Sequence, residues 1–208
     1  EWATANESVV KAANIILGFG YDQSQLKELR APSKEELDAV SADIPVVVVP
    51  QSGHMGALNS KALAIAGYTA DSKDPTGGVI ERKPGSQEPY GVVEEAAWFD
   101  IVPKLLGNVG PSGMKAVAKA GAEMWTSFGY TTAQEGRSSK SSDAVLKEAT
   151  ADGTIKIDVV TFPDFTTDRD YIKTNASRSY DNHFRVGGIK LTIDGSPQGF
   201  TAWRDRPY

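Results

Sequence analysis

The most constraining feature of this sequence is a regular alternation of strand and helix patterns that begins near residue 111. Apolar residues at helical spacing predict helices over about 111–128, 141–151 and 167–177. Runs of β-branched and aromatic residues predict strands over 130–135, 155–162 and 186–194. Strands that alternate with helices form βαβ units, whose right-handed crossovers make neighbouring strands parallel. We therefore predict an α/β fold built on a parallel sheet.

The last predicted strand carries an unusual lysine. At period two, Ile189, Leu191 and Ile193 share one face, whereas Lys190 and Asp194 share the other. Lysine is rarely buried without a partner or a task, so this polar face is expected to point into an enclosed space. A parallel β/α barrel provides such a space at the carboxyl ends of its strands. A closed barrel needs eight strands and about 250 residues, so we expect this chain to form part of one.

The first half of the chain has a less regular pattern. We predict a helix over 7–17 capped by Asn6 and a glycine-broken turn over 18–22. A short helix should follow Ser33, which lies at capping-box spacing from Glu36, with Leu37 and Val40 facing inward. The remaining predictions are a buried strand over 44–50, a glycine-rich loop over 51–56, a helix that Asn59 opens and Gly67 ends, a strand over 79–82, a hairpin-like excursion over 83–90, and a helix that contains Trp98 and ends near 107.

Composition excludes several classes of function. The 208 residues are 40% hydrophobic and carry a net charge of −5 without a basic run, which argues against nucleic acid as a partner. No apolar stretch reaches the roughly 20 residues that span a bilayer, and no signal-peptide pattern is present, so we predict a cytoplasmic protein without membrane contact. The chain has no cysteine and two histidines, too few for a complete zinc hydrolase site.

A set of short blocks along the chain resembles one family. The blocks are Gly18–Asp22, Leu37–Val40, Pro45–Val48, Ser52–His54, Asn59–Leu63, Gly77–Ile80, Pro89–Glu95, Gly129–Thr132, Gly187–Lys190, Asp194–Ser196, Thr201–Ala202 and Pro207–Tyr208. Together, in this order, they resemble amidohydrolase family 3, the metal-dependent hydrolases similar to N-substituted formamide deformylase. Each block alone is a weak signal, whereas the ordered set is fairly specific.

The resemblance implies a partial (β/α)8 barrel with an inserted α/β segment. Residues 1–97 would be the insertion that follows the first barrel strand, and residues 98–208 would hold barrel strands two to four. It also implies one or two divalent metals, usually zinc, and a small amide substrate. The family's His-x-His of the first strand and its later histidines and aspartate are absent from this sequence. We therefore expect the isolated segment to bind no metal and to be inactive, with the remainder of the barrel, or other copies of the chain, as partners for its unpaired edges.

The resemblance assigns Lys190 to the metal site. In the family, a lysine on the fourth strand is carboxylated, and the carbamate oxygens bridge two metals. That chemistry needs a neutral amine, which low-dielectric surroundings favour. The alternative is a barrel-interior lysine that pairs with a carboxylate. Without the other ligands, we expect no carboxylation in this segment.

Three further residues are candidates for catalytic roles. His54, in the glycine-rich loop, would reach over the barrel mouth to the substrate, or would be an ordinary capping or surface histidine. Glu135, at the end of a strand, would support the site, or would bond the next turn. Asp194 would orient a loop or contact substrate, although the Asp of an Asp-Gly turn is the simpler reading. Structural roles suffice for three other residues: Asn59 as a helix cap, Glu95 at a helix start and His183 at the amino end of a strand.

Two other classes of function remain open. The first is a non-catalytic binding or assembly module that keeps the α/β scaffold without a metal centre. The second is a glycosidase that uses Glu135 and Asp194 as its acid and base, although nothing else in the sequence indicates sugar binding.

Overall fold

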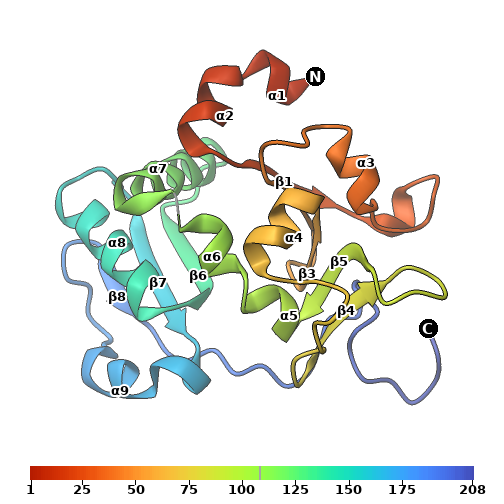
Figure 1. The fold of residues 1–208 in the computed structure, drawn as a ribbon. Coiled ribbons are helices and arrows are strands. Elements are labelled where there is room, and N and C mark those ends of the chain that lie inside the picture. The colour runs from red at the N-terminus through yellow and green to blue at the C-terminus, as the bar shows by residue number, and fades with distance from the viewer. Residues whose placement is uncertain (108) are drawn as a thin grey trace. The chain divides into compact units, whose positions relative to one another are not determined.

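The computed structural model describes residues 1–107 and 109–208 and divides into two compact units (Figure 1). Unit 1 comprises Glu1–Asn108 with Asp194–Tyr208, and unit 2 comprises Val109–Ile193. The elements of unit 1 are α1 (Trp2–Ala5), α2 (Glu7–Ala13), β1 (Ile16–Tyr21), η1 (Gln23–Gln25), α3 (Lys34–Asp38), β2 (Val46–Pro50), β3 (Met55–Leu58), α4 (Ser60–Ala66), β4 (Gly78–Arg82), β5 (Pro89–Glu95), α5 (Ala96–Phe99) and α6 (Val102–Leu106). Those of unit 2 are α7 (Gly110–Ser127), β6 (Thr132–Ser138), α8 (Lys140–Ala151), β7 (Asp158–Pro163), α9 (Phe165–Asn175) and β8 (Phe184–Val186).

Unit 1 is built on a mixed five-stranded sheet in the order β1-β2-β3-β5-β4. Only β1 and β2 are parallel, and the other pairs are antiparallel. The predicted strand over 44–50 is confirmed as β2, whose run of valines is buried because the strand lies inside the sheet and not at its edge.

Both faces of this sheet are covered. Val47 and Val49 of β2 enter a large core cluster with Leu58, Trp98 and residues of α4 and α6. Val46, one position earlier, enters a second cluster on the other face with Leu37 of α3. This alternation is the period of two that strand geometry imposes, and it produces a three-layer unit.

The start of unit 1 differs from the sequence prediction. The helix predicted over 7–17 ends at Ala13, because Asn14 adopts a left-handed conformation (φ 51°) that closes it. The Asn6 side chain makes no capping hydrogen bond. The predicted turn over 18–22 is instead most of β1, which pairs with β2 from Ile16 onward. The apolar spacing that suggested a helix is therefore shared by a helix and a following strand.

Two further strands of this sheet, besides β1, were missed. The loop predicted over 51–56 turns into β3 at Met55, and the approach to the predicted Trp98 helix is β5. Both strands contain glycine, which lowers strand propensity, and both depend on their neighbours for pairing. The helix predicted to end near 107 is two short helices, α5 and α6. Val40, expected to face inward, is 54% exposed because α3 ends at Asp38.

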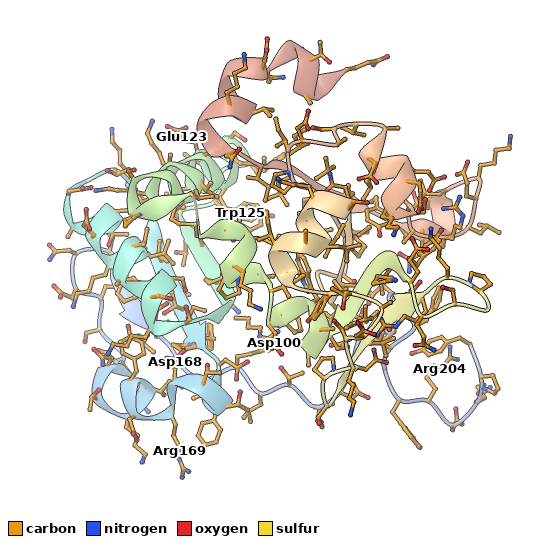
Figure 2. All side chains as sticks on the ribbon, in the orientation of Figure 1. Asp100, Glu123, Trp125, Asp168, Arg169 and Arg204 are labelled. Atoms are coloured by element: carbon orange, nitrogen blue, oxygen red, sulfur yellow. The ribbon has the colours of Figure 1, made fainter. Side chains whose placement is uncertain are left out.

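Unit 2 confirms the predicted alternation of strands and helices. Its three strands are parallel and lie in the order β6-β7-β8. Helix α8 packs along β7 and β8, and Ala149 joins Ile155, Val159 and Phe184 in one buried cluster (Figure 1). Helix α7 only borders this core, through Ala118 and Ala122. Figure 2 shows Glu123 and Trp125 on α7, and 43% of Trp125 is exposed.

The end of unit 2 corrects the prediction of a long last strand. Strand β8 stops at Val186, and Lys190 makes only an isolated parallel bridge with Asp164. The expected apolar face is not buried, since Leu191 is 63% and Ile193 98% exposed. Period-two spacing is thus present in the sequence without a partner strand to hold it among the described residues. The two sheets described here are open, so a barrel remains a prediction.

Within residues 1–107 and 109–208, none of the helices combines the length and the apolar character needed to cross a bilayer.

Asn59 joins the start of α4 to the rest of unit 1. Its side chain is wholly buried, and its carbonyl oxygen accepts the backbone N–H groups of Val46 (3.0 Å) and Ala62 (2.8 Å). Its amide group donates to the carbonyl oxygens of Ser41 (2.7 Å) and Ile44 (3.0 Å). The predicted cap is confirmed, and the same side chain also holds β2 and the loop before it.

We predict that Asn59→Ala lowers the free energy of unfolding by about 3 kcal/mol or more, because it removes a helix cap and leaves several buried backbone groups unpaired. Urea unfolding monitored by circular dichroism measures the change. Ser60→Ala, which loses only an exposed hydrogen bond to Asp38, is the matched control and should stay within about 0.5 kcal/mol of the parent. Equal effects of the two substitutions would contradict this role.

Candidate functional site

Three side chains from distant parts of unit 1 form a polar cluster. The Nδ1 atom of His54 lies 3.0 Å from Oε2 and 3.1 Å from Oε1 of Glu95. The hydroxyl of Thr201 donates to Oε1 of Glu95 at 2.5 Å. We call these residues the His54–Glu95–Thr201 cluster. Only 26% of the His54 side chain and 18% of the Glu95 side chain are exposed, so the cluster is a largely desolvated site.

Glu95 is placed by the end of β5. Its backbone has φ 49° and ψ −120°, a conformation that non-glycine residues rarely adopt. The backbone N–H of Glu95 donates to the His54 carbonyl at 2.8 Å, so the two residues are linked through both backbone and side chain. Glu95 lies at the start of α5, as its simple reading had it, but its side chain makes no capping hydrogen bond there.

The loop that carries His54 is held from α5. The indole N–H of Trp98 donates to the Gly53 carbonyl at 3.0 Å, and the Phe99 ring meets the His54 ring edge to face at 5.8 Å between centroids. Gly56 is required at the end of this loop, because a Cβ atom there would lie 2.4 Å from the Trp98 ring. Packing of α5 on β3 therefore fixes the imidazole ring.

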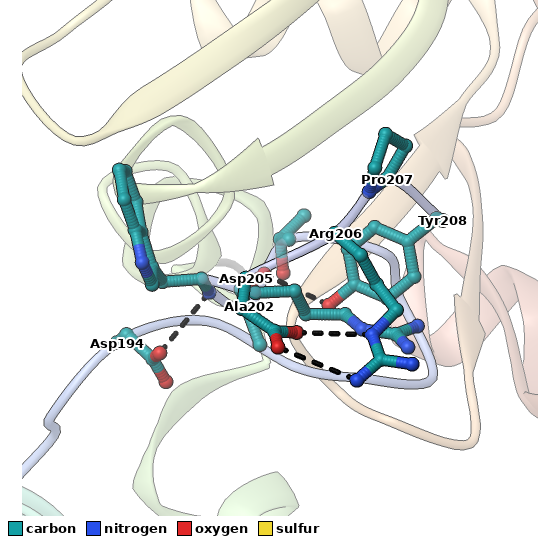
Figure 3. Close-up of a pocket in the computed structure, with 9 residues that line it drawn as sticks. Asp194, Ala202, Asp205, Arg206, Pro207 and Tyr208 are labelled. Atoms are coloured by element: carbon teal, nitrogen blue, oxygen red, sulfur yellow. Dashed lines mark hydrogen bonds and ion pairs between the residues drawn. The ribbon is translucent and has the colours of Figure 1, made fainter.

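The segment Asp194–Tyr208 supplies Thr201. The backbone N–H of Ser196 donates to the Thr201 hydroxyl oxygen at 2.9 Å, and the Asp194 carboxylate accepts the backbone N–H of Trp203 at 3.1 Å. Figure 3 shows this Asp194 contact among the residues of the segment that line an open pocket of about 590 Å³. This hydrogen bond agrees with the first of the three roles considered for Asp194, the orienting of a loop. Contact with substrate and the simpler role in an Asp-Gly turn stay predictions.

A pair of carboxyl groups lies beside the cluster. Glu94 of β5 and Glu81 of β4 share a hydrogen bond between their side chains. Burial, then this hydrogen bond and the charges of Glu81 and Glu95, raise the pKa of Glu94 to about 7. Burial also raises the pKa of Glu81. The pair therefore holds a proton at a pH at which an ordinary glutamate has lost it.

A second group of polar side chains lies in unit 2, at the carboxyl edge of β6 and β7. The carboxylate of Asp164 accepts Nε of Arg137 at 3.1 Å, and the backbone N–H of Arg137 donates to Glu135 at 2.9 Å. Burial opposes ionisation of Asp164, but hydrogen bonds from Thr166 and Arg137 outweigh it and lower the pKa of Asp164. The backbone of Lys190 bonds Pro163 (2.9 Å) and Phe165 (3.1 Å), on either side of Asp164.

Lys190 and Glu135 are thus brought to the same edge of one sheet, where active sites of α/β proteins are found. Lys190 is half-buried, whereas Glu135 is exposed. The expected bond to a following turn is not found, because β6 continues to Ser138 and Glu135 accepts the backbone N–H of Arg137 within the strand, where its register shifts. His183 lies at the amino ends of β7 and β8, where its ring contacts Asp158 at 2.7 Å, in line with a structural role.

The predicted metal site requires several ligand side chains that converge on one ion. Throughout the described part of the chain, no three histidine, aspartate or glutamate side chains converge as ligands of one ion. A catalytic zinc ion is held by three such protein ligands. The described residues therefore do not fit a metal centre by themselves.

Sequence reasoning missed Glu95, Thr201 and the Asp164–Arg137 pair. Only local signals were available for Glu95, and they favour a helix start. The contact between Glu95 and Thr201 joins residues 106 positions apart, and no local pattern reports such a contact.

A family model described as the amidohydrolase family matches residues 2–208 of the chain. The N-substituted formamide deformylase of Arthrobacter pascens is 38% identical over 82 residues, which cover 39% of this chain and 15% of that protein. The protein LONG AFTER FAR-RED 3 of Arabidopsis thaliana is 38% identical over 93 residues, which cover 45% of this chain and 16% of that protein. The matched segments thus span only about a sixth of the length of these relatives.

Among solved structures, an uncharacterized metal-dependent hydrolase from Pyrococcus horikoshii OT3 has a similar fold, with a TM-score of 0.60 and 22% identity. The match covers 97% of this chain and 40% of that structure. A second, from Pyrococcus furiosus, matches with a TM-score of 0.54 and 23% identity over 91% of this chain and 38% of that structure.

We predict that Glu94 makes the stability of the chain depend on pH between about 4.5 and 7. Its pKa is raised from 4.5 to about 7 in the folded state, so folding is favoured while the group is protonated. The contribution is complete below pH 4.5 and is lost as the pH rises through 7. Glu94→Gln cannot ionise and so avoids this loss. The difference in free energy of unfolding between variant and parent should therefore be more favourable to the variant at pH 8 than at pH 5, by on the order of 1 kcal/mol after solvent screening.

Urea unfolding at a series of pH values measures this effect. The exposed Glu28 provides the matched control, and Glu28→Gln should leave the pH profile of the parent unchanged. A Glu94→Gln profile that falls as steeply as the parent profile would show that Glu94 is not the responsible group.

Proposed function

The chain belongs to the amidohydrolase family, and from this premise we propose that the protein is a metal-dependent hydrolase that cleaves C–N bonds of small amides. The observation that carries the proposal is the match to the family model from residue 2 to residue 208. The printed name of the Arthrobacter pascens relative, a formamide deformylase, supports the choice of an amide C–N bond. The printed titles of the two structural neighbours support the choice of a metal-dependent reaction.

For the fold, we propose that β6, β7 and β8 are strands two to four of a β/α barrel. Their parallel order, with a helix between each pair, supports this assignment. Residues 1–97 would then be the α/β segment inserted after the first barrel strand. A separate mixed sheet within that segment agrees with an insertion that folds around its own core.

For the site, we propose that Lys190 is a metal ligand of the complete enzyme, carboxylated on its amine. Its support is its position after β8, beside the carboxyl edge of β6 and β7. The described residues lack a set of three further ligands, so the zinc or other divalent ion would draw them from other segments. Glu135 and Asp194 would act as supporting groups that fix the Arg137 backbone and the loop at Trp203, respectively.

One rival has an observation in its favour. A binding or assembly module without a metal centre agrees with the lack of converging ligands in the described part of the chain. The glycosidase alternative has no such support, because Glu135 and Asp194 are each engaged by a backbone N–H group.

We predict that the protein, isolated as its source organism makes it, binds zinc or another divalent metal in stoichiometric amount and hydrolyses small amides. Lys190→Ala should lower both metal content and hydrolysis at least about 100-fold, because loss of a ligand exceeds the 10–100-fold effect of losing an outer partner. Metal analysis by mass spectrometry and an amine-release assay measure the two quantities. Lys156→Ala, at an exposed lysine of the same unit, is the matched control and should retain both. Metal-free protein that still binds amides would support the binding module instead.

A further inference from the structure

The His54–Glu95–Thr201 cluster fixes where each hydrogen lies. The Thr201 hydroxyl oxygen already accepts the Ser196 N–H at 2.9 Å, so its own hydrogen points to Glu95. An ionised carboxylate can only accept hydrogen bonds. Glu95 therefore accepts one hydrogen bond from Thr201 and one from His54.

The second of these bonds sets the tautomer of the imidazole. Because Glu95 accepts from His54, the hydrogen of the neutral ring lies on Nδ1. The other ring nitrogen, Nε2, then presents a lone pair. A carboxylate that holds the Nδ1–H of a histidine in this way also fixes the orientation of the ring and strengthens Nε2 as an acceptor.

The surroundings of the ring restrict it further. The backbone N–H of Glu95 holds the His54 carbonyl, and the Trp98 indole holds the preceding carbonyl of Gly53. The strained backbone of Glu95, with φ 49°, is the arrangement that lets one residue contact His54 twice. Strain of this kind persists where the surrounding structure over-determines it, and it is concentrated at functional sites.

We propose that His54 is a ligand-contacting group whose Nε2 accepts a hydrogen bond or a proton from an N–H or O–H donor, that Glu95 is its positioning residue, and that Thr201 latches Glu95 in place. The donor is assigned to an amide N–H, and this choice alone rests on the proposed function. Segment 194–208 therefore contributes Thr201 to the site that His54 and Glu95 form.

Nitrogen-15 NMR of the 208-residue chain reads out both histidines, because the sequence contains only two. At a pH at which both rings are shown by titration to be neutral, His54 should carry its hydrogen on Nδ1. In Glu95→Gln, whose amide can donate, the ratio of the two tautomers should shift toward Nε2–H by about tenfold or more, since a charge-assisted hydrogen bond is lost. An Nε2–H tautomer in the parent, or an unchanged ratio in the variant, overturns the role of Glu95.

His183 is the internal control for this measurement. Its ring also contacts a carboxylate, that of Asp158 at 2.7 Å, but 59% of its side chain is exposed. Asp158→Asn should change only the His183 signals, and Glu95→Gln only those of His54.

Thr201 is tested by a separate pair of variants. Thr201→Val removes the hydroxyl and should speed the exchange of the Nδ1 hydrogen with solvent by several-fold without changing the tautomer, and Thr201→Ser should restore slow exchange. Exchange that is equally slow in the parent, Thr201→Val and Thr201→Ser overturns the role of Thr201 in holding Glu95. These variants keep the proposal testable even if Glu95→Gln does not fold.

The ligand chemistry is tested with two amides that differ in a single N–H group. N-methylacetamide should shift the Nε2 resonance of His54 in a saturable way, and N,N-dimethylacetamide, which lacks the N–H, should not. Equal shifts with both amides overturn the assignment of an N–H donor. None of these readouts needs catalysis, so their failure is distinct from a failure of the metal and hydrolysis test on Lys190.

Discussion

The candidate site of unit 1 depends on the hydrogen bonds that the Glu95 carboxylate accepts. The carboxylate accepts hydrogen bonds from His54, 41 residues earlier, and from Thr201, 106 residues later. The register that places Met55 opposite Glu94 also brings the loop of His54 to the end of β5. The contact between His54 and Glu95 therefore depends on the pairing of β3 with β5. The sheet thus brings His54 and Glu95 together, and segment 194–208 adds Thr201, so residues far apart in the sequence meet in one cluster.

The sheet itself depends on a buried polar anchor and on two covered faces. Asn59 satisfies backbone groups of β2, of the preceding loop and of α4, which would otherwise be buried without partners. Valines of β2 then pack alternately into the two core clusters. The close contact of Trp98 with Gly56 extends this packing to the loop of His54. A rigid scaffold thus holds a loop residue, which is a common arrangement of binding and catalytic groups.

Whether the sequence could predict a feature depends on how far apart along the chain its interacting residues lie. The capping box of Ser33 and the cap at Asn59 depend on residues three positions apart, and both are present as predicted. The alternation after residue 111 is a strong periodic signal and gave the correct order of three strands and three helices. Strands β3 and β5 depend on pairing with each other, so local patterns missed them. The position of Glu95 at a helix start is local and was predicted, whereas its contacts with His54 and Thr201 are long-range and were missed. The long strand predicted around Lys190 failed for the same reason: its spacing is right for a strand, but pairing ends at Val186.

A double-mutant cycle tests most directly whether Glu95 couples the side chains of His54 and Thr201 energetically. It is measured by urea unfolding of the 208-residue chain. The two side chains act on each other through a shared carboxylate, so His54→Ala and Thr201→Val should be non-additive by at least about 0.5 kcal/mol. The coupling should disappear when both are introduced into Glu95→Ala. Effects that add within about 0.3 kcal/mol in the parent, as for independent sites, would contradict the account.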